Sequence, residues 1–399
     1  MTLRREGNAL SSRSVLLIAP KAPPYGGMAL QAELLAQRMQ RDGVRVTFVA
    51  ANQPIPDSLR WFGRIAGIRT LLRLLIFCLQ VWRLTREAEV VHIFACSWVY
   101  FFVVVWPATI VGRLRGKRVV LNYRGGEADS FLRRYGLLVR PAFRLADVVT
   151  VPSGFLANVL SARTGVPVEI VPNIVDLAAF SYRERQIPTP RMVVTRHLEP
   201  LYDIETILRA FHEVQARYPD ASLFIAGTGS QEASLRALAA TLQLRNVNFL
   251  GMVSHAKLPA LYEQCDILLN ASRADNFPGS LVEAAAAGLV VISTGVGGIP
   301  YIFKDGESAL LIEPGDWKTL AARALRVVSE PGLASALTRA AYDQCRQYDW
   351  AHIRPLLYAV YNFQHHADGT SPSEKTSASR NRTGAISPKT SARRRASVN

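Results

Sequence analysis

Short apolar runs rich in Val, Ile and Leu alternate with helix-length amphipathic segments along most of the 399-residue chain. This alternation is typical of β-α-β units, in which helices connect parallel strands and cover both faces of the sheet. We interpret as strands residues 15–19, 44–50, 90–94, 118–122, 148–151, 168–171, 192–195, 222–226, 247–250, 267–269, 290–293 and 309–312, and as helices, for example, 30–41, 204–218 and 231–242. The pattern predicts an α/β fold built on doubly wound parallel sheets.

The chain is long enough for two domains of ordinary size. Residues 176–190 are polar and end in Ile-Pro-Thr-Pro, which is typical of a linker. We therefore expect Rossmann-like domains over 14–175 and 191–348, facing a cleft, because open parallel sheets bind ligands beyond the carboxyl ends of their strands. Residues 349–366 are expected to form a helix that packs back on the N-terminal domain. The Ser/Thr/Lys/Arg-rich residues 367–399 predict a disordered basic tail.

The positive charge is concentrated in two places. The chain has 47 Lys+Arg and 31 Asp+Glu, a net charge of +16. Residues 60–144 hold 15 basic and 4 acidic residues, residues 368–399 hold 7 and 2, and the remainder is balanced. Such an excess attracts nucleic acid, anionic lipid or an anionic substrate. No nucleic-acid recognition motif is present in the sequence, so we expect no nucleic-acid partner.

The four cysteines are too few and too scattered for a disulfide framework or a zinc site, which fits a reducing, cytoplasmic setting. Residues 90–112 form an uncharged run long enough to span a bilayer. Its first part has the pattern of a strand, and Pro107 falls inside it. We therefore expect a strand, a turn near residues 96–97 and a helix from Trp98 instead of a membrane span. The apolar run 15–19 is too short for a signal peptide.

Residues 60–86 predict a mostly apolar helix with a narrow polar stripe that includes Arg69, Arg73 and Gln80. One interpretation is a helix that packs on a sheet and leaves one edge exposed. The other is an interfacial helix whose arginines meet phosphate headgroups of an anionic membrane.

Two loops at strand ends have the chemistry of an anion site. Gly26-Gly27 follows the first strand and precedes a helix, so a ligand could approach the backbone and free N–H groups. This is not the G-x-G-x-x-G pattern, which argues against a dinucleotide enzyme. Arg196 follows strand 192–195, and its planar guanidinium could hold two oxygens of a diphosphate.

The segment 272–288 is the most informative. Asp275 lies in a loop that leads into a helix beginning at Gly279 and Ser280, whose N–H groups can bind phosphate. Glu283 follows one turn later, on an otherwise small and apolar helix. A ribose diol would supply this carboxylate with two hydroxyl donors. Asp275 would then lie on the other side of the phosphates, facing a sugar.

With these motifs in order, the chain resembles the retaining glycosyltransferases of family 4, which have the GT-B fold, from about residue 14 to about residue 364. The family's E-x7-E element resembles Asp275 to Glu283, with Glu-Ala-x-Ala-x-Gly at 283–288. Further matches are Gly26-Gly27 and the segments 171–176, 224–229 and 250–253.

The resemblance implies that a nucleoside diphosphate sugar is the co-substrate, with no metal or other cofactor. Glu283 would bind the ribose hydroxyls, Asp275 the donor-sugar hydroxyls, and Arg196 would neutralise the diphosphate; these three are the catalytic candidates. The other donor-binding residues implied are Gly26, Gly27, Arg124, Gly227, Met252, Val253, Phe277, Pro278, Gly279, Ser280 and Leu281.

Three departures from the family pattern stand out. Position 275 is Asp where the family more often has Glu. Leu201 and Tyr202 stand where a second diphosphate-binding lysine is expected. Arg124 stands where the family often has a histidine, and we expect it to supply the missing charge or to bind an anionic acceptor.

The function expected from the resemblance is sugar transfer with retention, in exopolysaccharide, lipopolysaccharide or glycolipid synthesis. The acceptor would be lipid-linked or a glycan, and the protein would be cytoplasmic, with peripheral contact to an anionic membrane at its cytoplasmic face. Two alternatives stay open, a non-catalytic sugar-nucleotide-binding relative and a GT-B-fold sugar-nucleotide epimerase.

Overall fold

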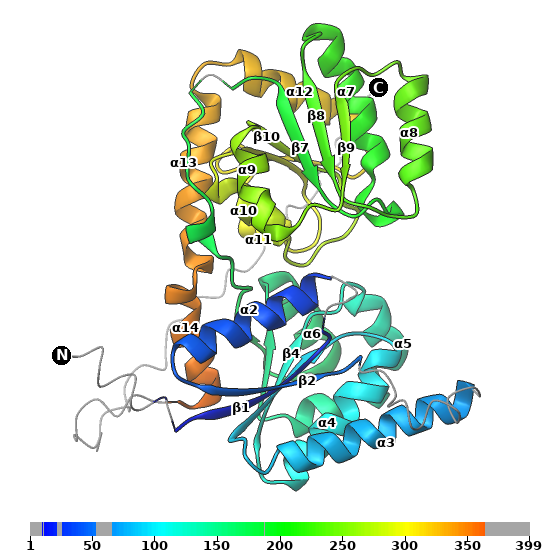
Figure 1. Ribbon diagram of the computed structural model, residues 1–399, viewed down its shortest axis with the longest axis vertical. Helices are drawn as coiled ribbons and strands as arrows, with labels where there is room; N and C mark the ends of the chain where they lie inside the picture. Colours follow the sequence, from blue (N-terminus) through cyan, green and yellow to red (C-terminus); the bar gives the residue numbers. More distant parts are fainter. Residues whose placement is uncertain (1–9, 11, 22–25, 53–65, 187, 364–399) are drawn as a thin grey trace, which may run out of the picture. The chain divides into compact units, whose positions relative to one another are not determined.

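The computed structural model describes residues 10, 12–21, 26–52, 66–186 and 188–363. These residues form two six-stranded sheets, each flanked by helices (Figure 1). Each of the twelve runs interpreted as strands forms one, which confirms the predicted α/β architecture. The predicted tail 367–399 and the first residues of the basic stretch, 60–65, lie outside the described residues.

The first sheet is parallel throughout and has the order β2-β1-β3-β4-β5-β6. Its strands are β1 (Ser14–Ala19), β2 (Arg45–Ala50), β3 (Val90–Ala95), β4 (Arg118–Tyr123), β5 (Val148–Val151) and β6 (Glu169–Ile170). The helices between them are α2 (Gly27–Arg41), α3 (Ala66–Leu84), α4 (Trp106–Leu114), α5 (Ala128–Leu145) and α6 (Gly154–Thr164). Because β1 pairs with both β2 and β3, the strand order reverses direction there, as in other doubly wound folds.

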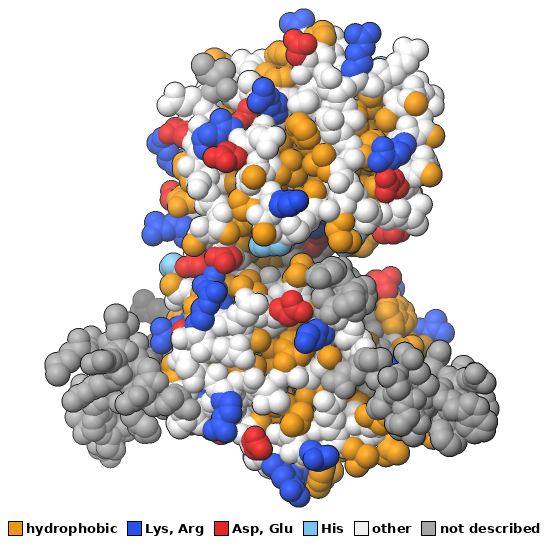
Figure 2. Space-filling model, in the orientation of Figure 1, with side chains coloured by type: hydrophobic (Ala, Val, Ile, Leu, Met, Phe, Trp, Pro, Cys, Tyr) orange, Lys and Arg blue, Asp and Glu red, His pale blue; other side chains and the backbone are white. Residues whose placement is uncertain are grey.

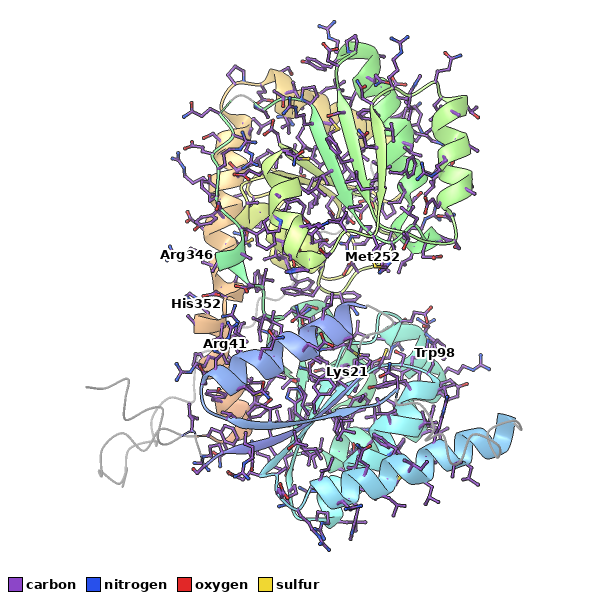
Figure 3. The ribbon with its side chains drawn as sticks, viewed as in Figure 1. Lys21, Arg41, Trp98, Met252, Arg346 and His352 are labelled. Carbon is purple, nitrogen blue, oxygen red and sulfur yellow. The ribbon has the colours of Figure 1, made fainter. Side chains whose placement is uncertain are left out.

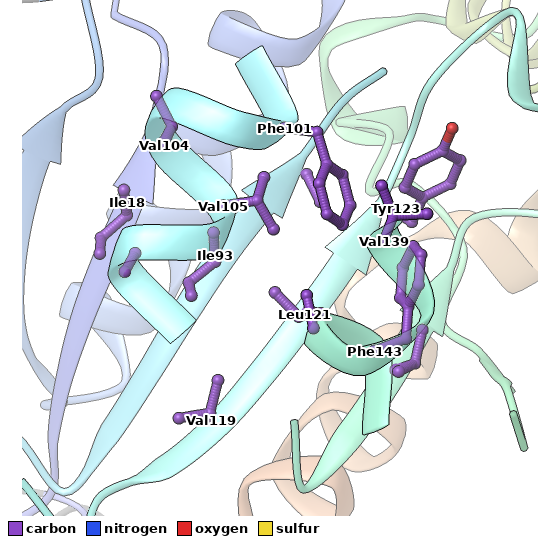
Figure 4. Packing of buried hydrophobic residues seen from close by; sticks show 14 of the residues in the cluster. Ile18, Ile93, Phe101, Val104, Val105, Val119, Leu121, Tyr123, Val139 and Phe143 are labelled. Carbon is purple, nitrogen blue, oxygen red and sulfur yellow. The ribbon is translucent and has the colours of Figure 1, made fainter. Parts of the chain in front are cut away.

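Alternate residues of each strand point to opposite faces of this sheet. Leu16 and Ile18 of β1 pack with the layer formed by α3, α4, α5 and α6, where Figure 4 shows Phe101, Val105 and Phe143 packed against the strands. Val15 and Leu17 face the other side and pack with α2 and α14 (Trp350–Tyr361).

Helix α14 is held to the first sheet by hydrogen bonds as well as by apolar contacts. The indole of Trp350 and the hydroxyl of Tyr358 donate to one carboxylate oxygen of Asp42, at 3.2 and 2.8 Å. Tyr361 is buried beside His92 of β3, and the two side chains form a hydrogen bond. Helix α14 thus completes the hydrophobic core that α2 forms on one face of the first sheet.

The uncharged run 90–112 divides as the sequence suggested. It forms the buried strand β3, then a π-helical segment η3 (Phe101–Val105) that continues into α4. Pro107 lies where η3 passes into α4, so the π-helical segment and the residue that lacks an N–H fall at the same point of one continuous helix. Among the described helices, none has the length and apolarity that a membrane crossing requires.

The second sheet is also parallel and has the order β12-β11-β10-β7-β8-β9. Its strands are β7 (Arg191–Thr195), β8 (Ser222–Ala226), β9 (Val247–Gly251), β10 (Ile267–Asn270), β11 (Val290–Thr294) and β12 (Leu310–Ile312). Its helices are α7 (Ile204–Arg217), α8 (Glu232–Thr241), α9 (Leu258–Glu263), α10 (Gly279–Ala286), α11 (Ile299–Ile302), α12 (Trp317–Ser329) and α13 (Leu333–Cys345). Short 3-10 helices are η4 (Leu177–Ala179), η5 (Pro200–Tyr202), η6 (His255–Lys257) and η7 (Arg346–Tyr348).

The polar segment 176–190 is more firmly packed than its composition suggests. Arg185 is 2% exposed, and its guanidinium donates to the carboxylate of Asp266 and to the carbonyl oxygens of Cys265 and Ala287. Burial lowers the pKa of Arg185 to about 10, so the side chain stays charged at neutral pH. The other oxygen of Asp266 accepts bonds from Thr189. The end of the segment is therefore fixed to the second sheet by buried polar contacts.

Candidate functional site

The candidate site is formed by loops at the carboxyl ends of β7, β8, β9 and β10. Arg196 directly follows β7, Gly227 follows β8, and Met252 follows β9. The loop with Asp275 connects β10 to α10, which carries Glu283. Because β7 and β10 are neighbours in the sheet, the first and last of these loops are placed side by side.

Arg196 and Asp275 form an ion pair with an Nη2–Oδ2 distance of 3.0 Å. Both side chains are largely buried, at 12% and 14% exposed. The Nε of Arg196 donates to Oδ1 of Asn270 at 2.9 Å, and its guanidinium lies 5.4 Å from the centre of the Tyr202 ring. The structure thus brings together two of the three predicted catalytic residues and fixes the plane of the guanidinium from two sides.

Asn270, at the end of β10, is the centre of a buried polar network. Its Nδ2 donates to Ser293 Oγ at 2.9 Å, and its Oδ1 accepts a second bond from Ser272 Oγ at 2.7 Å. Thr294 in turn donates to the carbonyl of Ser272. Every member is buried. The network fixes the orientation of the Asn270 amide and so the position of the arginine that it binds.

Glycines let these loops approach one another closely. A Cβ at position 227 would overlap the carbonyl oxygen of Arg196. A Cβ at Gly297, which has φ +57°, would overlap the carbonyl oxygen of Asp275, and the next residue, Gly298, donates its N–H to that same oxygen at 2.8 Å. The backbone on both sides of the Arg196–Asp275 pair therefore depends on residues without side chains.

Helix α10 points its amino end at this group. Pro278 occupies the N-cap position and provides no side-chain cap, so the first N–H groups of the helix have no acceptor from that residue. Asp275 Oδ1 accepts the N–H of Phe277 at 3.1 Å, which turns the loop into the helix. The Oγ of Ser280 is buried without a hydrogen-bond partner among the described residues. The arrangement offers donors to an anion.

Glu283, one turn into α10, binds a residue that sequence reasoning missed. Its Oε1 lies 2.9 Å from Nε2 of His255, which belongs to η6 after β9. Glu283 is 14% exposed and His255 is 49% exposed. The hydrogen bond to Glu283 raises the pKa of His255, and the imidazole also lies perpendicular to the Phe180 ring, with the ring centres 6.2 Å apart. In this structure His255 thus forms a hydrogen bond with the carboxylate that was predicted to bind a ribose.

Arg124 is turned into the first sheet. Its guanidinium lies 4.3 Å from the centre of the Phe94 ring, and its Nε donates to Asn122 Oδ1 at 3.1 Å. Burial lowers the pKa of Arg124 to about 9. This value is still above neutral pH, so the side chain remains charged there. Its main chain, by contrast, meets the donor loop, because Asn276 Nδ2 donates to the carbonyls of Arg124 and Gly125. No described contact joins its guanidinium to the Arg196–Asp275 pair.

Some of the remaining predicted donor-binding residues are accessible to a ligand, and others have buried side chains. Gly26 and Gly27 lie at the start of α2, and no atom of the described residues lies within 4 Å of a Cβ built on either. Met252, labelled in Figure 3, is 62% exposed at the end of β9, and Val253 packs beside it on a buried cluster. Phe277 and Leu281 are buried, so only their main chains can contact a ligand.

In the part of the chain that the structure describes, no group of three or more His, Cys, Asp or Glu side chains could hold a metal ion. Besides His255, sequence reasoning missed Asn270 and Asn276. Asn270 ends a buried strand, and Asn276 lies in the following loop between Asp275 and Phe277, so the signal available was position at a strand end for Asn270 and position in the segment 272–288 for Asn276.

Two family models match the chain. Residues 25–179 match Glycosyltransferase Family 4, and residues 184–344 match Glycosyl transferases group 1. The chain belongs to the group 1 glycosyltransferases. The two matches confirm the resemblance seen in the sequence, and the second spans Arg196, Asp275 and Glu283.

Among curated relatives, a phosphatidyl-myo-inositol mannosyltransferase of Mycolicibacterium smegmatis is 26% identical over 197 residues, 48% of this chain and 50% of the relative. The D-inositol 3-phosphate glycosyltransferase of the same species is 31% identical over 213 residues, 49% and 47% of the two chains. The chain thus spans about half the length of these relatives. HepE of Anabaena, solved in complex with UDP and glucose, has a TM-score of 0.68 at 16% identity, over 88% of this chain and 99% of that one. That likeness shows the GT-B fold.

Proposed function

We propose that this glycosyltransferase transfers a sugar from a nucleoside diphosphate sugar to a lipid-linked or glycan acceptor, with retention at the anomeric carbon. The observation that carries the proposal is the pairing of Arg196 with Asp275 in front of α10, one turn away from Glu283. A diphosphate needs a cation, the donor sugar needs a carboxylate, and the ribose needs a second carboxylate. The site offers all three.

The diphosphate would bind at the amino end of α10. Main-chain N–H groups of Gly279 and Ser280, together with the unpartnered Oγ of Ser280, are the available donors. The partial positive charge at a helix amino end stabilises an anion there. The fold holds these hydrogen-bonding groups in place before the sugar nucleotide binds. Little reorganisation is therefore needed when charge develops on the leaving phosphate.

Arg196 would stabilise the negative charge that develops on the diphosphate as the glycosidic bond breaks. Asn270 keeps the guanidinium plane fixed, so its second edge can face the phosphate oxygens. In the structure Asp275 forms an ion pair with this arginine. When the sugar nucleotide binds, hydroxyls of the donor sugar would also donate hydrogen bonds to Asp275. We assign no protein general base, and propose that the leaving phosphate accepts the proton of the acceptor hydroxyl.

Glu283 would accept hydrogen bonds from both ribose hydroxyls. His255 must then release Oε1 or share it with the ribose. Since His255 is half exposed and lies in the short helix η6, its side chain can turn into solvent without opening the core. The relatives support this proposal through their names, as a mannosyltransferase and a glycosyltransferase, and the HepE structure through its UDP and glucose.

The pathway is proposed to be exopolysaccharide, lipopolysaccharide or glycolipid synthesis at the cytoplasmic face of a membrane. One relative, named for a phosphatidyl-inositol acceptor, supports a lipid-linked acceptor. The nucleotide and the sugar of the donor are the first properties to determine.

A donor panel screened by thermal shift identifies the donor, because a ligand at 100 times its Kd adds about 2.7 kcal/mol to the stability of the folded state. Release of nucleoside diphosphate is then followed with acceptor. We expect Glu283→Ala and Arg196→Ala to abolish release, while Arg209→Ala, on the exposed face of α7, retains it. Folded Glu283→Ala or Arg196→Ala protein with wild-type turnover would refute the proposal. Donor binding with no turnover on any acceptor would favour the non-catalytic alternative, and epimerised donor without acceptor would favour the epimerase.

A further inference from the structure

Helix α3 carries an apolar stripe on its solvent side. Leu71, Leu75, Leu79 and Trp82 are 67%, 55%, 55% and 39% exposed. Their spacing of four, four and three residues places them within about 80° of one another around the helix axis. The buried residues Phe77 and Val81 belong to a different side of the helix, where they join the core of the first sheet. The exposed leucines therefore contribute nothing to the core.

The apolar surface continues over the two neighbouring helices. Helix α4 packs between α3 and α5. It exposes Ile110 and Leu114, the latter at 71%, one turn apart. Helix α5 exposes Leu137 and Leu138, at 89% and 61%. A solvated helix layer of a monomer usually shows single apolar residues, whereas a surface shared by three helices indicates a contact site. Figure 2 shows hydrophobic side chains beside Lys and Arg side chains at the surface over α3.

Arginines border this surface at the carboxyl end of each helix. Trp82 is followed by Arg83, and Leu114 lies between Arg113 and Arg115. The Arg115 guanidinium lies 4.7 Å from the centre of the Trp82 ring and so links α3 with the end of α4. Since α3, α4 and α5 each lead directly into a strand of one parallel sheet, their carboxyl ends lie along the same edge.

Few acidic residues lie near these arginines. Asp147 pairs with Arg113, Asp129 with Arg133 and Glu89 with Arg13, and Glu87 is exposed just after α3. Arg73 and Arg83 are exposed and have no ion-pair partner among the described residues. On α3 they lie beside the apolar stripe, between it and the buried side. The helix thus has an inner apolar face, an outer apolar stripe and a cationic edge.

We propose that the outer face of α3, α4 and α5 docks on an anionic phospholipid bilayer. The leucines and Trp82 enter the headgroup region, and the arginines reach phosphate oxygens while their methylene chains stay in apolar contact. A second copy of this chain fits the surface poorly, because it would bring the same net positive charge against itself. Docking on a bilayer goes beyond sugar transfer and does not depend on the donor site.

Flotation of the full chain with phosphatidylcholine vesicles, with and without phosphatidylglycerol, tests the proposal. We expect binding only to the vesicles that contain phosphatidylglycerol, weakened by salt because lipid charge is screened. The double variant L75Q/L79Q should lower the vesicle partition coefficient by about tenfold or more, since two leucine side chains leave the bilayer. These substitutions are neutral, so any purely electrostatic binding, for instance by the C-terminal basic residues, would be unchanged.

Leu356→Gln is the matched control, because Leu356 is 47% exposed on α14, which covers the opposite face of the first sheet. It should float like the wild type. Equal flotation of L75Q/L79Q and wild type, or no flotation of the wild type, would overturn the proposal. So would a change from dimer to monomer in L75Q/L79Q without lipid binding, which would make the face an interface between copies. Donor release with a soluble acceptor, measured on L75Q/L79Q, should equal that of the wild type, so a failed transferase and a failed membrane surface are distinguishable.

Discussion

Replacing Arg196 by lysine keeps the positive charge of the site and removes the planar guanidinium with its fixed N–H groups. Lysine has no equivalent of the Nε–H that donates to Asn270 at 2.9 Å, and no second N–H edge. Its ammonium would still reach the carboxylate of Asp275, because a point charge needs no fixed plane. The variant should therefore fold and bind donor, but it should hold the leaving diphosphate poorly.

The size of the effect follows from the hydrogen bonds lost. A hydrogen bond to a charged group contributes about 1.5–3 kcal/mol, and one such bond to the diphosphate is lost in the transition state. At about 1.4 kcal/mol per factor of ten, kcat/KM should fall by roughly 10- to 150-fold. Most of the loss should appear in kcat, because the charge on the diphosphate grows as the bond breaks.

The assay is steady-state release of nucleoside diphosphate by wild type, Arg196→Lys and Arg209→Lys, with thermal unfolding of each. Arg209 forms an exposed pair with Glu205 on α7, so its replacement should leave both kinetics and Tm nearly unchanged. If folded Arg196→Lys kept kcat/KM within about twofold of wild type, the fixed guanidinium plane would have no role in the transition state, and the reasoning would fail.

Three further outcomes are expected. Glu283 raises the pKa of His255, so their pair stabilises the folded state fully below the unfolded pKa, and this stabilisation is lost as pH rises through the folded pKa. His255→Gln should lower the free energy of unfolding at pH 6 by at most about 1 kcal/mol, since the imidazole is half exposed, and should leave it unchanged at pH 9. Equal losses at both pH values would contradict this. Gly227→Ala should cost about 1–3 kcal/mol in unfolding free energy because its Cβ has no room, whereas Gly136→Ala, where no described atom lies within 4 Å of the new Cβ, should not. Asn122 and Phe94 anchor the Arg124 side chain, and its main chain holds Asn276 beside Asp275, so Arg124→Ala should lower kcat/KM more than tenfold, about 1.4 kcal/mol. Unchanged kinetics would show that this anchoring has no part in transfer.

Much of the fold could be predicted because parallel strands buried on both faces must be continuously apolar. β1 and β3 are buried at every residue, and their largely apolar runs are visible in the sequence without any alignment. The pairing of Arg196 with Asp275 was also within reach, since both follow strands whose carboxyl ends share one edge.

Contacts made by short or irregular segments could not be predicted. His255 lies in a single-turn helix far from Glu283 in sequence, and no periodicity shows which strand end it approaches. Arg185 lies in a polar run with the composition of a linker, yet it is buried on Asp266. Composition reports average solvation, whereas an ion pair together with hydrogen bonds to carbonyl oxygens is enough to bury such a residue.

The central claim is that Glu283 and the amino end of α10 hold the nucleotide of a sugar donor. Calorimetric titration of wild type and Glu283→Ala, each with the ribose donor and with its 2′-deoxy analogue, tests this most directly. Wild type should prefer the ribose donor by about tenfold or more, from one charge-assisted hydrogen bond, and Glu283→Ala should bind the two donors equally. A preference for ribose that persists in folded Glu283→Ala would contradict the account.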